Sequence, residues 1–321
     1  MKATNRIIKN MPLPIAGLIL SMAVMGNILE DIHVNIRYAY GITAAVLMLF
    51  LILKILFYRE TTVKELENPL ILTVFPTFDM GLMVLATYIN RFHVTAAFYI
   101  WVFAVFIHFC WIIYVTKKLF LNFDMNKIFP SIFVTYVGIV TASVTAPVFK
   151  MQTLGQYIFY FGFISYLLLI IIVFFRMVKI KGIPEPAFPA GAILAAPASL
   201  CLAGYISSFK DKNEVILYFL LGLSLFMTFF VLFFFYKFHT KKFYPSFSAF
   251  TFPFVISTLA LKSYIKYLNT HQGTGSMIFS KELLTGVYYF ELILSVAAIF
   301  YVLIRYVMFF KAKFAVVRES D

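Results

Sequence analysis

Three ionisable residues lie deep inside apolar stretches of the sequence, where chemistry would proceed without bulk water. Asp79 is ten residues into one apolar run, and Glu291 is at the ninth position of another. At 1.5 Å per helical residue, Asp79 would lie roughly 15 Å deep, near the middle of a membrane. Burying an acid there costs about 2.5 kcal/mol or more, so both acids are candidate proton-coupling residues. The alternative is a carboxyl group hydrogen-bonded to a neighbouring helix, and His108 is a candidate for the same packing role.

The remaining reactive side chains give no pattern typical of catalysis or metal binding. Cys110 and Cys201 are the only cysteines, and both lie inside apolar runs, so they form neither metal spacing nor a disulfide framework. The sequence has no GxGxxG, P-loop or HExxH motif. We therefore expect no enzyme activity, no catalytic residues, no metal and no cofactor.

The composition is that of a membrane protein. Hydrophobic residues make up 62% of the 321 residues, and charged residues make up 13%. Soluble domains have about 45–50% apolar and about 25% charged residues, which excludes a soluble enzyme, a disordered chain and a secreted disulfide scaffold. The net charge of +13 is explained by basic loops between membrane spans, so we expect lipid contact and no nucleic-acid partner.

The apolar residues form ten runs, and each is close to the roughly 20 residues that a membrane-spanning helix needs. The runs are 12–29, 36–57, 70–89, 94–116, 129–148, 154–176, 188–208, 215–237, 246–266 and 283–310. Short gaps pair them into helical hairpins over about 12–57, 70–116, 129–176, 188–237 and 246–310. Continuous runs exclude a β-barrel, whose strands alternate. The sequence predicts an all-α membrane protein with one transmembrane domain, residues 1–321.

Basic residues are distributed unequally between the two ends of these runs. The segments on the side of the N-terminus hold 19 of the 27 Lys and Arg residues, and the opposite segments hold eight. Because cytoplasmic loops carry the excess of Lys and Arg, we expect a multi-pass protein of the plasma or inner membrane with both termini cytoplasmic.

Prolines mark a fivefold internal repeat. Odd-numbered runs begin near Pro12, Pro69, Pro130, Pro189 and Pro245, at separations of 57, 61, 59 and 56 residues. A helix breaker follows seven or eight residues later in four repeats, namely Pro76, Gly138, Pro197 and Pro253. The first repeat has Leu20 at that position, with Pro14 and Gly17 nearby. One helical hairpin thus recurs five times.

The two helices of a hairpin differ in side-chain size. Run 188–208 has 13 Gly, Ala, Ser, Thr or Pro residues in 21, whereas run 215–237 has three in 23. Small residues allow close helix packing, which predicts five inner and five outer helices in quasi-fivefold symmetry. Carbonyls freed by a kink are tolerated where they face protein or a water-filled cavity, which favours a central pore. The alternative is a helical bundle without a pore, in which the small residues and prolines serve only close packing.

Three short segments resemble one known family. Residues 11–17 (MPLPIAG), 188–191 (FPAG) and 248–253 (SAFTFP) resemble the tellurite-resistance/dicarboxylate transporter family, which includes bacterial TehA and the slow anion channel of plant guard cells. The resemblance extends over about 11–310. It implies ten helices in five hairpins, a central pore and a homotrimer. It also implies that a phenylalanine of the ninth helix closes the pore, and the matching residue is Phe252.

The candidate pore residues follow from these patterns. Phe252 directly precedes the kink proline Pro253, and Phe75 holds the equivalent place before Pro76, so both are candidate gates, with side-chain packing as the alternative. The candidate pore-lining or kink residues are Pro14, Gly17, Pro76, Gly138, Pro197, Thr251 and Pro253.

The interior of such a pore would bind ions weakly. No Lys or Arg lies near the middle of an inner run, and the polar groups there are hydroxyls, of Thr73, Thr77, Thr135, Thr141, Ser199 and Thr251. Because conduction requires weak binding, this favours a channel or permease for small inorganic or organic anions. The alternative is a proton-coupled secondary transporter of a dicarboxylate, sulfite or a similar anion, with Asp79 or Glu291 as the proton site.

Overall fold

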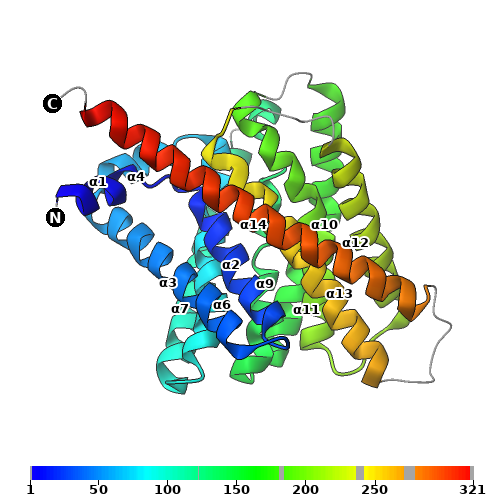
Figure 1. Cartoon of the computed structure of the whole chain (residues 1–321). Helices are drawn as coiled ribbons and strands as arrows, with labels where there is room; N and C mark the ends of the chain where they lie inside the picture. Colours follow the sequence, from blue (N-terminus) through cyan, green and yellow to red (C-terminus); the bar gives the residue numbers. More distant parts are fainter. Residues whose placement is uncertain (1, 122, 181–183, 236–241, 271–278, 319–321) are drawn as a thin grey trace.

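The described part of the chain is helical and contains no β-strand (Figure 1). The computed structural model describes all residues except 1, 122, 181–183, 236–241, 271–278 and 319–321. In chain order the elements are α1 (Lys2–Asn10), α2 (Ile15–Leu29), α3 (Val34–Phe57), α4 (Arg59–Glu65), α5 (Pro69–Val74), α6 (Thr77–Ile89), α7 (Val94–Phe120), η1 (Met125–Lys127), α8 (Ile132–Tyr136), α9 (Val140–Thr145), η2 (Ala146–Phe149), α10 (Gln152–Lys179), η3 (Glu185–Ala195), α11 (Ala196–Ser208), α12 (Glu214–Phe235), η4 (Pro245–Phe250), α13 (Phe252–Thr270) and α14 (Lys281–Arg318).

Within the described residues, eight helical segments are long and apolar enough to cross a membrane. They are 34–57, 69–89, 94–120, 152–179, 185–208, 214–233, 245–270 and 281–313. The first and fifth predicted runs correspond to shorter apolar helices, Ile15–Leu29 and Val140–Phe149. The prediction of an all-α protein with many apolar spans is confirmed.

Some helices begin or end at other residues than the predicted apolar runs, because apolar composition does not determine where a helix ends. α14 continues to Arg318, beyond the predicted end at 310, because a helix can extend past the apolar stretch. α2 begins only at Ile15, after Pro12 and Pro14. The short helices α1 and α4 were not predicted, and the last two residues of the predicted run 215–237 lie outside the described residues.

Burial separates the spans into two groups. In segments 69–89, 185–208 and 245–270, 78–89% of the residues of the most apolar stretch are buried, against 28–39% in the other five spans. Nearly every residue of α2 is buried as well, and so is most of α8 and α9. The small-residue segments thus form the interior, and the bulky ones lie outside, as the composition of the hairpins predicted.

The interior helices contact one another in a regular order. α2 contacts α6 and α13, α9 contacts α6 and α11, and α11 contacts α13. Each also packs against the long helix that follows it in the chain: α3, α7, α10, α12 or α14. α14, the longest helix, runs across α13 and α2 in Figure 1, and both contacts are present.

The interior segments are interrupted at the residues that the repeat singled out. Pro76 lies between α5 and α6, and Gly138 lies between α8 and α9. Pro197 and Pro253 lie in the first turns of α11 and α13, directly after 3₁₀ segments. Proline cannot donate a backbone hydrogen bond and clashes with the preceding turn, which explains the interruptions at Pro76, Pro197 and Pro253. Pro14 precedes α2.

Candidate functional site

A narrow central cavity lies among the interior segments. Its volume is about 30 Å³, and residues of every interrupted segment line it. Six residues that the sequence singled out meet here: Gly17, Thr77, Gly138, Pro197, Phe252 and Pro253. The helix interruptions therefore converge on one space.

Two glycines permit the close backbone contacts around this cavity. A Cβ atom at Gly138 would lie 2.0 Å from the carbonyl oxygen of Val134 and 2.7 Å from Sδ of Met80. A Cβ atom at Gly17 would lie 3.3 Å from both Cβ and the carbonyl oxygen of Ser248. Only Gly138 strictly excludes a larger residue, because the backbone itself occupies the space.

A second small cavity, the outer cavity, adjoins the central one. It has a volume of about 40 Å³ and is lined by α2, α6, α9, α11 and α13. Phe252 and Leu200 line both cavities, so they lie at the boundary between them. The Phe252 residue is only 6% exposed. A benzyl ring and a leucine side chain thus separate two narrow spaces along the interior helices.

A wider cavity adjoins the opposite end of the central one. This vestibule has a volume of about 350 Å³ and shares Val74 and Ala249 with the central cavity. Lys9 of α1 and Lys313 of α14 line it, together with Pro14. The three cavities follow one another in the order vestibule, central cavity, outer cavity.

A buried ion pair fixes the backbone beside the vestibule. Lys54 is fully buried; its Nζ donates to the carbonyl oxygen of Met11 at 2.5 Å and pairs with Glu65. The other carboxylate oxygen of Glu65 accepts the backbone N–H of Leu13 at 3.1 Å. Lys54 therefore connects α3, α4 and the start of the first span. The charge count had placed Lys54 at the cytoplasmic ends of the runs, but no local pattern indicated its burial.

Two of the predicted pore residues, Phe75 and Thr251, take part in contacts with neighbouring residues. The Phe75 ring stacks on Phe78 at 5.6 Å and meets Trp111 of α7 edge-on at 5.3 Å. Thr251 donates to the carbonyl oxygen of Ser248 at 2.7 Å. Of the predicted residues, Phe75, Pro76 and Thr251 are not among the described residues that line the three cavities.

The two intramembrane acids face neighbouring helices. Asp79 of α6 is fully buried, and its Oδ2 lies 2.6 Å from Nδ1 of His108 on α7. Nε2 of His108 lies 2.9 Å from the carbonyl oxygen of Thr135. Glu291 of α14 accepts a hydrogen bond from Ser257 of α13 at 3.0 Å. Neither acid is among the described lining residues of the three cavities.

Most of the predicted interior hydroxyls form bonds between helices or to the backbone. Thr73 bonds to Ser131 at 2.6 Å, and Ser199 bonds to Ser224 at 2.8 Å. Thr77 lines the central cavity but donates to the carbonyl oxygen of Val74. Thr141 lines the outer cavity, and its hydroxyl has no hydrogen-bond partner among the described residues.

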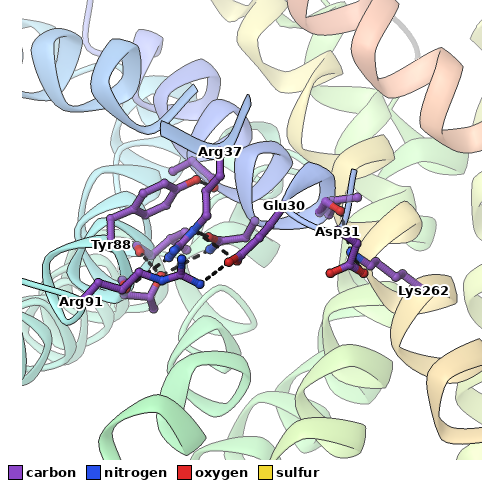
Figure 2. Close-up of polar contacts among 11 residues, drawn as sticks. Glu30, Asp31, Arg37, Tyr88, Arg91 and Lys262 are labelled. Carbon is purple, nitrogen blue, oxygen red and sulfur yellow. Dashed lines mark hydrogen bonds and ion pairs between the residues drawn. The ribbon is translucent and has the colours of Figure 1, made fainter. Parts of the chain in front are cut away.

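Charged residues cluster at the outer end of α2 (Figure 2). Glu30 pairs with Arg91, and its second oxygen lies 3.4 Å from Nε of Arg37. The Arg37 guanidinium stacks over the ring of Tyr88 at 4.3 Å. A separate pair joins Lys262 of α13 to Asp31 at 2.8 Å.

Arg91 is a permanently charged residue at this end of α2. Desolvation works against its charge, but hydrogen bonds with Glu30 and Tyr38 outweigh it and raise the pKa of the Arg91 guanidinium. Arg91, which lies between α6 and α7, is thus a fixed positive charge next to the ends of these helices.

Sequence reasoning missed Leu200 and Asn27. Leu200 carries no local signal, since it is one leucine among many in apolar helices. Asn27, which lines the outer cavity, is the only side-chain amide in the run 12–29, and that isolation could have identified it.

The described residues offer no metal site. Among them, no group of three His, Cys, Asp or Glu side chains is arranged to hold an ion. Cys110 and Cys201 are both free.

Comparison with known proteins agrees with this geometry. The sequence profile of SLAC1, described as voltage-dependent anion channel, matches residues 10–307. No curated protein sequence matches the chain significantly. The match covers nearly the whole chain and confirms the resemblance to the tellurite-resistance/dicarboxylate transporter family, whose members are channels and transporters of small anions. The chain is thus a multi-pass membrane protein, and it belongs to the SLAC1 family of voltage-dependent anion channels.

Proposed function

We propose that the chain is a gated anion channel whose central pore is closed by the ring of Phe252. One observation carries the proposal: Phe252 lines both the central and the outer cavity. A side chain at that boundary blocks passage when its ring lies across the path. Leu200 shares the position and would narrow the same constriction.

The proposed pore is enclosed by ten spans arranged as five hairpins in quasi-fivefold symmetry. The contacts among α2, α6, α9, α11 and α13 support this arrangement, because each of these helices has two interior neighbours. The interruptions at Pro76, Gly138, Pro197 and Pro253 support it further, since similar kinks recur in similar places. In this proposal the outer helices contact lipid.

The charge distribution favours anions as the permeating ions. Lys9, Lys313 and Glu65 line the vestibule, and Glu65 is paired with the buried Lys54, so the lining is net positive. At the outer end of α2, Arg37 and Arg91 share the single carboxylate of Glu30. Clusters of one charge raise the local concentration of the opposite ion at a channel mouth. The described lining of the central cavity has no charged side chain, which keeps binding weak enough for release.

The orientation follows from the basic residues of the connecting segments. We place the vestibule, α1 and both termini in the cytoplasm, because that side holds 19 of the 27 Lys and Arg residues and cytoplasmic segments carry the excess of basic residues. A homotrimer in the cell membrane is the assembly that the family resemblance implies. Separation by mass in lipid nanodiscs tests that assembly.

The proposed gate is tested by electrophysiology in planar bilayers with chloride, nitrate and malate. We expect Phe252→Ala to raise anion current strongly, because it removes the ring between the cavities. Phe226→Ala is the matched control, since this ring is 60% exposed on α12. Unchanged current in well-folded Phe252→Ala protein would contradict the proposed gate.

The same recordings test Phe75, the second candidate for the gate. The Phe75 ring packs on Trp111 of an outer helix, which favours a packing role and a current close to that of the unaltered protein in Phe75→Ala. A current as large as that of Phe252→Ala would instead assign a gate to both residues.

Proton coupling stays a prediction. Asp79 contacts His108 and Glu291 contacts Ser257, contacts that favour the packing alternative for both acids. Uptake into liposomes separates the two functions: accumulation driven by a pH gradient and abolished by Asp79→Asn would indicate coupled transport. Passive flux that does not saturate would indicate a channel.

A further inference from the structure

The side-chain amide of Asn27 has a fixed orientation at the outer cavity. Nε of Arg37 donates to Oδ1 of Asn27 at 2.8 Å. A guanidinium can only donate, so the amide oxygen must face Arg37 and the NH₂ group must point elsewhere. Nδ2 of Asn27 donates to Oγ1 of Thr87 at 3.3 Å. One of its two N–H bonds thus remains for the cavity that Asn27 lines.

A second donor lies on the wall of the same cavity. Thr141 of α9 is 3% exposed, and its hydroxyl has no hydrogen-bond partner among the described residues. An unsatisfied buried polar group costs about 1–3 kcal/mol. Buried hydroxyls are normally satisfied, so this hydroxyl is available to a species that enters the cavity.

The positive charge of Arg37 lies next to the Asn27 amide, on the side of its oxygen atom. Arg37 is 3% exposed, and one of its terminal nitrogens has no partner in the described part of the chain. The single carboxylate of Glu30 is shared between Arg37 and Arg91, as Figure 2 shows. These three residues carry one negative and two positive charges, so the cluster favours an anion next to it.

We propose that the outer cavity is a binding subsite for one small inorganic anion, held by the Asn27 amide and the Thr141 hydroxyl. Arg37 is a positioning residue that orients the amide and adds a positive potential. The inference deepens the proposed channel function and rests on it. A volume of about 40 Å³ exceeds the roughly 10–15 Å³ that one water needs but is too small for a dicarboxylate. The subsite therefore selects halides or nitrate.

Neutral donors suit a site inside a conduction path. The amide and the hydroxyl bind an anion without a direct ion pair, so the anion can leave. The charge of Arg37 is partly compensated by Glu30 and acts through Asn27 rather than by contact. A site next to Phe252 on the outer cavity would hold the anion on the far side of the proposed gate from the vestibule.

Bromide is the probe that tests this subsite directly. We expect a crystal of the full chain grown in sodium bromide to show an anomalous difference peak in contact with Nδ2 of Asn27 and Oγ1 of Thr141. Thr141→Val removes a donor while keeping side-chain shape, and Asn27→Asp replaces the amide donor by a carboxylate that also repels an anion and pairs with Arg37. Each should weaken bromide binding about tenfold or more, because a hydrogen bond to a charged group is lost.

Two further variants separate the subsite from general effects of substitution. Thr141→Ser retains the hydroxyl and should retain most of the binding. Thr43→Val makes the same change as Thr141→Val at a described hydroxyl that bonds to its own helix backbone on an exposed position of α3, and should leave the bromide peak unchanged. Tm titrations with bromide against gluconate at constant ionic strength give the affinities.

The outcomes distinguish this inference from the gate. A bromide peak between the two donors that both donor variants abolish supports the subsite, whatever the currents are. No peak in the outer cavity, or a peak that survives both variants, overturns the subsite even if Phe252→Ala conducts. A Phe252→Ala protein without anion current overturns the proposed channel and leaves the bromide result to decide the subsite.

Discussion

Replacing Lys54 tests how the cytoplasmic end of the proposed pore is held. The residue is fully buried and connects the carbonyl oxygen of Met11 to the carboxylate of Glu65. Lys54→Met keeps the length of the side chain and removes its charge and donors. The buried Met11 carbonyl then loses this donor, and the vestibule loses the contact that joins α3 and α4 to the first span.

The expected loss of stability follows from the exposure of the two partners. Removing one member of a buried ion pair costs about 3–5 kcal/mol. The Glu65 side chain is 25% exposed and borders the vestibule, so water can solvate it after the substitution. We therefore expect the lower end, about 3 kcal/mol, which corresponds to a decrease in Tm of roughly 5 °C for a chain of this size.

A double-mutant cycle measures the pair itself. Glu65→Gln leaves Lys54 buried without its carboxylate and should destabilise at least as much as Lys54→Met. The double variant should be more stable than the sum of the single effects predicts, by about 2 kcal/mol. Lys117→Met is the matched control, because Lys117 is exposed near the end of α7. Single effects that add within about 0.5 kcal/mol would refute the coupling.

Three further substitutions probe the charge, the packing and the buried acid. In the Phe252→Ala background, Glu30→Gln should raise anion flux roughly two- to fivefold at low salt, since two arginines lose their counter-ion, and the gain should fade at high salt; equal flux at all salt concentrations would contradict this. Gly138→Ala should lower stability by about 1–3 kcal/mol, measured as Tm, because its Cβ would meet the Val134 carbonyl at 2.0 Å; an unchanged Tm would refute the close contact. Asp79→Asn should lower Tm but leave Phe252→Ala currents intact, and lost current in folded protein would show that the acid serves conduction.

Local rules explain what the sequence could predict. The breakers Pro76, Gly138, Pro197 and Pro253 interrupt helices at their predicted places, because a missing N–H or Cβ acts on its own turn. Side-chain size along each run predicted which helices are buried, since close packing excludes bulky residues. The all-α class and the family followed from these patterns and are confirmed.

Contacts between distant segments could not be predicted in this way. Nothing in the spacing pairs Asp79 with His108, or Lys54 with Glu65, because these contacts depend on how helices rotate about their axes. The same holds for Leu200, whose position beside Phe252 at the cavity boundary has no signature in an apolar run. The orientation of Asn27 likewise depends on Arg37, ten residues further on and in the next helix.

Along the proposed path, the charged residues lie at the two ends and the uncharged, apolar stretch lies at the centre. Lysines line the vestibule and arginines lie behind the outer cavity, whereas the described lining of the central cavity has only apolar groups and the hydroxyls of Thr77 and Ser248. Both hydroxyls already bond within the protein. An anion drawn in by the ends must therefore give up water at the centre with little compensation. Capture then depends on the charged ends, and discrimination among anions depends on the energy of dehydration at Phe252, which favours weakly hydrated anions such as nitrate over chloride.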